Sequence, residues 1–273
     1  MTMAQQTTPA ELPGSDLDTR KMPGHWLLAR LGKRVLRPGG LGMTTELLDD
    51  LSIGPADHVV EFAPGLGVTA RMILAKQPAR YTGVERDAKA MQWTSRHLPH
   101  TPDIAVVIGA ADKTDLPAGS ASVVIGEAML SMNTQEQKQR IAAEAFRVLR
   151  PGGRYGIHEL CVVPDDMPPR QKQDIDNTLS SVIHVGARPL PAREWRDLLE
   201  RTGFRVRHVG YAPMHLLRPK RIVEDEGLWG ALRLGKNLLL DGEARRRVLA
   251  MRSVFERYRD HLSAILVVAE KPL

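Results

Sequence analysis

Between residues 58 and 163 the sequence alternates between short apolar runs and stretches with helical spacing of apolar residues. The apolar runs predict strands at 58–63, 80–86, 103–110, 121–128 and 154–163. Helices are expected between them, at 67–77, 88–98 and 135–150. A strand followed by a helix, repeated in this way, is typical of a parallel sheet with helices on both faces. The sequence therefore predicts an α/β fold.

The segments around this core divide the chain further. Residues 1–20 are polar and rich in Thr, Pro and Gln, which predicts a disordered tail. An N-terminal helical cap is expected over 21–54, beginning with a helix at 25–36. The main domain then spans 55–273. Its C-terminal part predicts a helix at 191–204, a strand at 205–212, a basic helical insertion or lid at 213–260, and a closing strand within 261–273.

A glycine turn follows the first expected strand in "HVVEFAPGLGVTARMIL", residues 58–74. A triphosphate loop would need a lysine after its last glycine, but Val68 follows Gly67. The stretch "GLGVTA" does match a dinucleotide loop. However, Glu61 at the end of the strand would repel a pyrophosphate. This carboxylate suits S-adenosylmethionine, which has no phosphate and carries an ammonium and a sulfonium charge.

Two further acids follow the next two expected strands. Glu85 ends the second strand, where a carboxylate accepts hydrogen bonds from the two hydroxyls of a ribose. NAD enzymes also place an acid there, so Glu85 indicates an adenosine ribose without deciding the cofactor. Asp112 follows the third strand, where a carboxylate can accept a hydrogen bond from an adenine amino group.

Four motifs occur in this order: "VVEFAPGLG", "GVERD", "ADKTDLP" and "AFRVLRPGGRYGI". Together they resemble the class I S-adenosylmethionine-dependent methyltransferases, in particular the small-molecule branch that includes ubiquinone, menaquinone and sterol-type enzymes. The resemblance implies a Rossmann-like, doubly wound sheet of seven strands, mostly parallel, whose last strand is antiparallel. It also implies an enzyme that methylates O, N, C or S of a small organic molecule.

The resemblance assigns the cofactor contacts residue by residue. The methionine part would lie against the first motif, in which alanine replaces the first glycine: Glu61, Ala63, Gly65 and Gly67. The adenosine would lie against the next two motifs: Glu85, Arg86, Ala111 and Asp112. The segment 126–132 would pass under the reactive methyl group, which adds Gly126 and Glu127 to the expected site.

Methyl transfer is an in-line displacement, so the enzyme mainly has to align the acceptor with the methyl carbon. Some acceptors also need a group that takes a proton. Residues at the ends of the fourth and fifth strands, and one in the helical segment that follows, are the candidates: Glu127, His158, Glu159 and His184.

Other features limit the alternatives. The sequence contains no apolar run of about 20 residues and no signal-peptide core, and its single cysteine, Cys161, fits a reducing cytoplasm. No Cys/His cluster has zinc-ligand spacing, so no metal site is expected.

The net charge of +6 comes from the C-terminal part, notably 218–221 and 245–247. It allows a second hypothesis, a cofactor-binding protein or RNA methyltransferase that uses the basic insertion. Against a nucleic-acid partner stand the 4% aromatic content and the absence of an Asn/Asp-Pro-Pro-Tyr/Phe tetrapeptide after the fourth strand.

Overall fold

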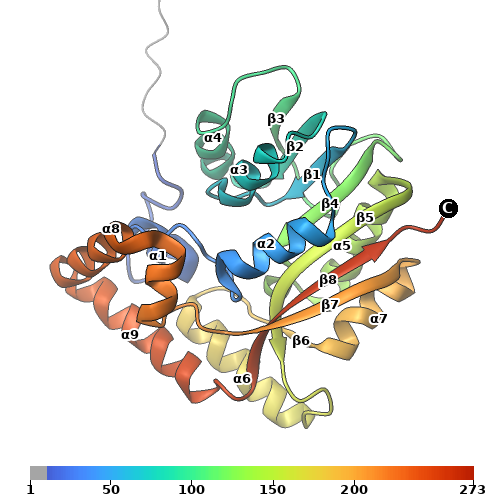
Figure 1. Ribbon diagram of the computed structural model, residues 1–273. Helices are drawn as coiled ribbons and strands as arrows, with labels where there is room; N and C mark the ends of the chain where they lie inside the picture. The colour runs from blue at the N-terminus through green and yellow to red at the C-terminus, as the bar shows by residue number, and fades with distance from the viewer. Residues whose placement is uncertain (1–10) are drawn as a thin grey trace, which may run out of the picture.

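The computed structural model describes residues 11–273, which are built around one mixed sheet (Figure 1). Its strands in the described part of the chain are β1 (His58–Phe62), β2 (Arg80–Glu85), β3 (Ile104–Ile108), β4 (Ala121–Glu127), β5 (Leu149–Val162), β6 (Leu190–Pro191), β7 (Arg205–Pro213) and β8 (Leu262–Glu270). They lie in the order β3-β2-β1-β4-β5-β8-β7, and β6 pairs with the end of β5. The pairs β5–β8 and β7–β8 are antiparallel, and the others are parallel.

The predicted α/β fold and the antiparallel last strand are confirmed. The predicted strand number is wrong, because the sheet has eight strands and not seven. The additional strand is β6, whose two residues pair with Cys161 and Val162 of β5. Two residues are too few to produce the alternation from which a strand is recognised in a sequence.

Nine α-helices of the described chain surround the sheet. They are α1 (Gly24–Arg30), α2 (Gly40–Asp50), α3 (Val68–Ala75), α4 (Ala88–Arg96), α5 (Gln135–Val148), α6 (Pro169–Ile183), α7 (Ala192–Thr202), α8 (Pro219–Leu240) and α9 (Gly242–Arg257). A short 3-10 helix, η1 (Leu130–Met132), follows β4. None of these helices is long and apolar enough to cross a bilayer.

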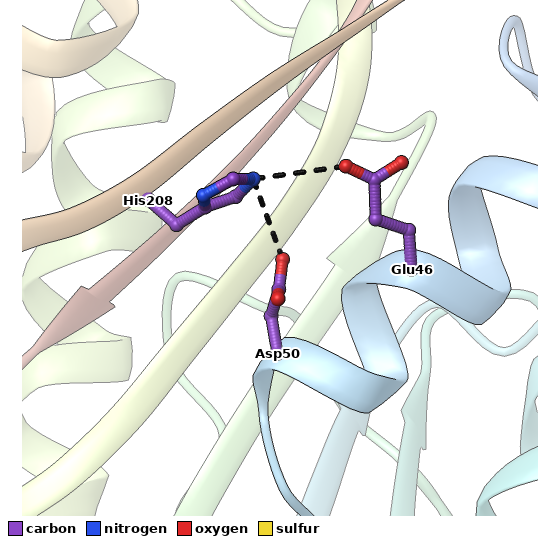
Figure 2. A group of neighbouring side chains, drawn as sticks. All are labelled: Glu46, Asp50 and His208. Atoms are coloured by element: carbon purple, nitrogen blue, oxygen red, sulfur yellow. Dashed lines mark ion pairs between the residues drawn. The ribbon is translucent and has the colours of Figure 1, made fainter.

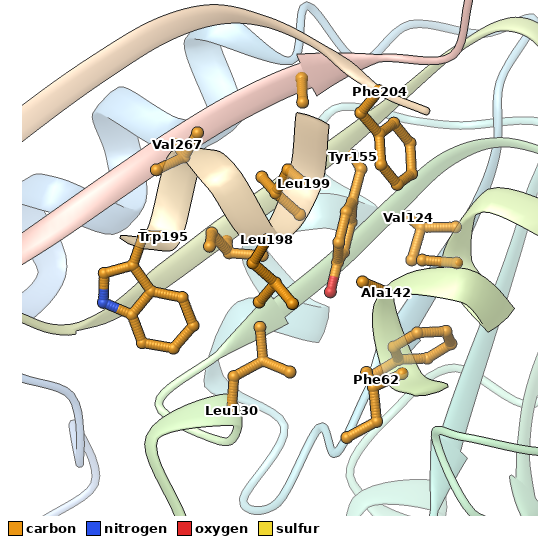
Figure 3. Packing of buried hydrophobic residues seen from close by; sticks show 14 of the residues in the cluster. Phe62, Val124, Leu130, Ala142, Tyr155, Trp195, Leu198, Leu199, Phe204 and Val267 are labelled. Atoms are coloured by element: carbon orange, nitrogen blue, oxygen red, sulfur yellow. The ribbon is translucent and has the colours of Figure 1, made fainter. Parts of the chain in front are cut away.

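The two faces of the sheet carry separate apolar cores. Helices α5 and α7 cover one face, where Trp195 and Leu199 pack around Tyr155 of β5 (Figure 3). Helix α2 covers the other face over β5 and β8, and its Leu47 and Leu51 join the second core with residues of α3. Burial on both faces fixes the strands rigidly, so that their ends can hold side chains in set positions.

Helices α1, α6, α8 and α9 gather beside the sheet (Figure 1). Leu27 and Leu31 of the N-terminal cap pack against Leu234 of α8 and Met251 of α9. The cap of 21–54 and the insertion of 213–260 are therefore joined by a shared apolar core, although they are far apart in the sequence.

The helix expected over 25–36 is shorter in the structure, because α1 ends at Arg30. Gly32 has φ +107°, a left-handed conformation that stops the helix and suits glycine. Residues 31–39, which include this glycine, form an irregular segment that runs to α2.

The first half of the predicted tail, 1–10, lies outside the described residues. The second half is not disordered in the structure, because residues 11–20 form hydrogen-bonded turns, such as Ser15 N–H to the carbonyl of Leu12 at 3.0 Å. Gly14 lies directly against the ring of Trp26 in α1, which leaves no room for a larger residue.

A buried lysine connects the irregular segment to α8. The ammonium of Lys33 is fully buried and lies 3.5 Å from Asp225 and 3.4 Å from Glu226. Glu226 also accepts hydrogen bonds from the backbone N–H groups of Arg34 and Val35, both at 2.8 Å. These acids of α8 thus fix the course of the segment between α1 and α2.

Replacing this lysine by an apolar residue should destabilise the protein strongly. Lys33→Met leaves two buried carboxylates without their cation, for which we expect a loss of about 3–5 kcal/mol in the free energy of unfolding. Urea unfolding followed by circular dichroism measures it. The exposed Lys220→Met is the control and should change stability by less than about 0.5 kcal/mol. Equal stabilities of the two variants would contradict a structural role of the buried lysine.

Candidate active site

A cavity of about 560 Å³, here called the strand-end cleft, opens at the carboxyl ends of β1 to β4. The strand order reverses between β1 and β4, since β2 and β3 continue on one side and β5 on the other. In open parallel sheets this reversal point is the place where ligands bind. The structure therefore places the glycine turn and the predicted acids at the edge where a ligand site is expected.

The turn from β1 to α3 brings bare backbone to the cleft. Ala63, Gly65 and Gly67 have φ of +54°, +56° and +70°. A glycine adopts this conformation without strain, whereas Ala63 does so at a cost of about 1 kcal/mol. A methyl group added to Gly65 would meet no side chain, because it would point into open space. Ala63 and Gly65 line the cleft; Gly67 lies just behind them at the start of α3.

Glu61 is buried at the floor of the cleft, with 4% of its surface exposed. The hydroxyl of Tyr81 on β2 donates to its Oε2 at 2.6 Å. Gly83 lies beside this hydroxyl and leaves it room, because a methyl group there would approach it to 3.1 Å. Burial raises the pKa of Glu61 to about 8. The hydrogen bond of Tyr81 and the more distant charge of Arg37 oppose this shift, and the nearby carboxylates of Glu127 and Glu85 add to it.

Glu127, at the end of β4, has the opposite environment. Its carboxylate lies 2.5 Å from the guanidinium of Arg37 and accepts hydrogen bonds from the hydroxyls of Thr44, at 2.7 Å, and Thr69. His158 Nδ1 lies 2.8 Å from Oε1. Burial alone would raise the pKa of Glu127, but the charge of Arg37 and the hydrogen bond to His158 lower it to about 2.

The two buried acids therefore differ in charge compensation. Glu127 holds its negative charge against Arg37, whereas no Lys or Arg within residues 11–273 forms an ion pair with Glu61. A buried carboxylate without a cation is costly when ionised, so Glu61 is poised to receive a positively charged group from a ligand.

The remaining expected contacts also lie at the cleft. Glu85 accepts hydrogen bonds from the N–H groups of Gly65, at 3.1 Å, and Asp87, at 3.0 Å, and burial raises its pKa. Asp112 follows β3, and its carboxylate lies 3.1 Å from Arg140 of α5. Arg86 and Ala111 line the same cavity. The structure thus brings these four residues to one cavity.

Besides Gly67, one more expected residue does not reach the cavity. Gly126 is buried inside β4, where it pairs with Phe62 of β1 and Ile157 of β5, and it does not line the cleft. Its neighbour Glu127 does, because successive residues of a strand point to opposite faces.

All four predicted proton acceptors are engaged or placed elsewhere, and Glu127 is held by Arg37 and its neighbours. His158 is fully buried in β5 between Glu127 and the N–H of Gly39, which donates to Nε2 at 3.0 Å. Glu159 is fully buried and accepts four hydrogen bonds from residues 129–131, so it fixes the start of η1. His184 ends α6 in a left-handed conformation and lines neither this cleft nor the chamber described next.

A second cavity of about 100 Å³, here called the apolar chamber, adjoins the cleft. Its walls come from the cap, α6 and α9, and are mostly Leu, Ile, Met and Phe side chains. Five residues line both cavities and so form their common boundary: His25, Leu36, Ala128, Met132 and Val185.

Sequence reasoning missed several residues of the site. Arg37 and Thr69 bind Glu127, Tyr81 binds Glu61, and His25 stands at the boundary of the two cavities. Arg37 belongs to "RPGG", which predicts only the end of a helix. A buried arginine in a loop has no periodic signal, so only the fold reveals its partner.

The described residues contain one group with the spacing of metal ligands, Glu46 and Asp50 of α2 with His208 of β7 (Figure 2). His208 Nε2 lies 3.6 Å from Glu46 and 3.5 Å from Asp50, which marks ion pairs when the imidazole is protonated. The group is on the surface and lines neither cavity.

The chain is similar to known proteins in both sequence and fold. Residues 59–153 match the methyltransferase domain family. An uncharacterized protein of Haemophilus influenzae is 32% identical over 251 residues, which cover 91% of this chain and 98% of the relative. An O-methyltransferase of Pyrenophora dematioidea is 28% identical and covers 72% of each chain.

A solved structure with the same fold is the phosphoethanolamine N-methyltransferase 2 of Haemonchus contortus, in complex with phosphomonomethylethanolamine and S-adenosylhomocysteine. It has a TM-score of 0.69 at 14% identity and matches 92% of this chain and 57% of its own.

The charge state of Glu61 should be visible in stability. Its pKa is about 8 in the folded protein and near 4.5 in an unfolded chain, so the folded state binds the proton more tightly. The free energy of unfolding of the ligand-free wild type should therefore fall relative to Glu61→Gln as pH rises from about 5 to 8, by roughly 3–5 kcal/mol.

Urea unfolding at several pH values measures this difference. The exposed Glu136→Gln serves as control and should follow the wild type at every pH. A constant difference between wild type and Glu61→Gln over this range would show that Glu61 is already ionised or is not buried.

Proposed function

Because the chain belongs to the class I S-adenosylmethionine-dependent methyltransferases, we propose that the strand-end cleft holds the cofactor and the apolar chamber holds the acceptor. The expected family, the enzyme class and S-adenosylmethionine as cofactor are confirmed. The narrower likeness to ubiquinone, menaquinone and sterol-type enzymes stays a prediction, as does a cytoplasmic location.

The observation that carries the proposal is the uncompensated carboxylate of Glu61. S-adenosylmethionine brings an ammonium and a sulfonium charge, and the ammonium would supply the cation that Glu61 lacks within the protein. Glu127 cannot take this role as readily, because Arg37 already neutralises it. The fit is therefore one of charge: Glu61 can ionise when the ammonium of the ligand lies beside it.

The other acids fit the adenosine part. Glu85 is buried and close to the glycine turn, where its oxygens can accept from ribose hydroxyls in addition to backbone N–H groups. Asp112 lies farther along the cleft and can accept from an adenine amino group. A pyrophosphate would meet three carboxylates in the same cavity, which argues against a dinucleotide.

When bound, S-adenosylmethionine supplies an electrophilic methyl group. The chain has to hold that group and the acceptor in line and to keep water away. Arg37 with its two threonine neighbours fixes Glu127 rigidly beneath the cleft. Ala128 and Met132 form the wall through which the cleft meets the chamber, and they bring no competing nucleophile.

The apolar chamber supports a small, largely apolar organic acceptor. The basic insertion gives little support to a nucleic acid, since several of its arginines bind within the protein. Arg218 donates to Glu256 at 2.8 and 2.9 Å, and Arg246 donates to Glu243 at 3.2 Å. Arg247 donates to the carbonyl of Thr19. These contacts are what the solvated or structural interpretation of a basic segment predicts.

Isothermal titration with S-adenosylmethionine, NAD and ATP tests the proposal. We expect the wild type to bind only the first. Glu85→Ala should weaken this binding by about 1–3 kcal/mol, because ribose hydroxyls lose their buried partner. Glu194→Ala is the control, since its carboxylate is exposed on α7 and lines neither cavity.

Two results would contradict the proposal. Binding of NAD in place of S-adenosylmethionine would make the cleft a dinucleotide site. Unchanged affinity of a correctly folded Glu85→Ala variant would remove Glu85 from the site.

A further inference from the structure

We propose that His25 binds the reacting hydroxyl of the acceptor and receives its proton, and that the acceptor is a one-ring aromatic hydroxy compound. This inference rests on the proposed function and assigns the acceptor side of the same site. His25 is the second residue of α1 and is not among the four proton acceptors predicted from the sequence.

The position of the imidazole is the first argument. His25 is one of the five residues that line both cavities, so a group at the boundary between cofactor and acceptor lies within its reach. Its ring packs against Trp26, with 4.6 Å between ring centroids, and Trp26 is itself held by Gly14. The ring is therefore supported on one side by the protein and faces the cavities on the other.

The missing partner is the second argument. The Nδ1 atom of His25 is buried and has no hydrogen-bond partner in the described part of the chain. A buried polar atom without a partner is costly, and in an enzyme site a ligand commonly supplies the partner. Because no protein group binds Nδ1, the protein does not fix which ring nitrogen carries the proton. The bound acceptor can set it.

The other buried histidine of the site shows the contrast. His158 has both ring nitrogens occupied, by Glu127 and by the N–H of Gly39. It positions Glu127 and has no nitrogen left for a substrate. In contrast, Nδ1 of His25 has no partner in the described part of the chain and is left for a substrate.

The ring can accept a hydrogen bond from the acceptor. Burial lowers the pKa of His25 to about 4, and the charge of Asp87 opposes this shift only in part. The imidazole is therefore neutral near pH 7, and it is too weak a base to ionise a free hydroxyl. It receives the proton as the oxygen–carbon bond forms, because this bond makes the hydroxyl proton far more acidic.

The chamber limits the acceptor. An engineered apolar cavity of roughly 150 Å³ holds a benzene ring. The chamber has about 100 Å³ and opens into the larger cleft, so one ring can fill it while a substituent reaches the boundary. The walls are apolar except near His25, Ser131 and Glu159, and Glu159 has its oxygens occupied by residues 129–131. A hydroxyl at the boundary would therefore meet His25.

The reaction step balances as follows. The hydroxyl oxygen of the acceptor forms a bond to the methyl carbon while the carbon–sulfur bond breaks and leaves its electron pair on sulfur. The hydroxyl proton passes to His25 and from there to water. A phenol suits this step better than an aliphatic alcohol, because its pKa of about 10 lets a neutral imidazole assist.

A pair of probe ligands tests the inference without turnover. The protein, saturated with S-adenosylhomocysteine, is titrated with phenol and with anisole, which has the same ring and no hydroxyl proton. We expect the wild type to bind phenol about tenfold more tightly, which is the contribution of one buried hydrogen bond. The anisole carries an additional methyl group, so the hydrophobic effect alone would make it bind more tightly. Tighter binding of the phenol therefore reports the hydrogen bond.

Three variants complete the test. His25→Leu should lose the preference and bind both probes alike, and His25→Gln should recover part of it through its amide oxygen. The exposed His100→Leu should keep the preference of the wild type. With a methyltransferase acceptor in place of the probes, His25→Leu should lower kcat more than it raises KM.

The inference is overturned if the wild type binds the two probes equally or binds neither, or if His25→Leu keeps the preference. Failure of S-adenosylhomocysteine to bind the wild type would instead refute the proposed function. The two failures are thereby distinguishable in the same titrations.

Discussion

The site depends on the unequal treatment of two buried carboxylates at the ends of neighbouring strands. Glu127 is paired with Arg37 and ionised, while Glu61 receives only a hydroxyl hydrogen bond from Tyr81. Their pKa values, about 2 and about 8, express this difference. Glu61 is therefore mostly protonated near pH 7 in the ligand-free protein and can ionise when a cationic group binds beside it. This arrangement favours a cationic ligand over an anionic one.

The N-terminal cap makes this charge arrangement possible. Arg37 comes from the irregular segment between α1 and α2, and that segment is fixed by Lys33 and the acids of α8. The insertion of 213–260 therefore acts on the cofactor side of the site, through the segment it fixes, as well as on the acceptor side, through α9. The same cap supplies His25. Arg37, which acts on the proposed cofactor side, and His25, which we propose acts on the acceptor, therefore come from one short stretch of chain.

Much of this could be predicted from the sequence, because it depends on local pattern. Alternating strands and helices predicted the fold, and the strand-end positions of Glu61, Glu85 and Asp112 predicted the proposed cofactor side. The rest depends on contacts between distant segments, which no spacing reveals. The two-residue strand β6 forms only because β5 is there to pair with it. His158 was expected as a base but serves to hold Glu127, and His25 was not considered because a single histidine in a cap helix carries no motif.

A crystal structure with S-adenosylhomocysteine bound tests the central claim most directly. If Glu61 ionises to bind the cation of the ligand, the amino group of the ligand lies within hydrogen-bond distance of that carboxylate, and the ribose hydroxyls lie against Glu85. An amino group placed away from Glu61, with this side chain still bound only to Tyr81, would contradict the charge-based assignment of the site.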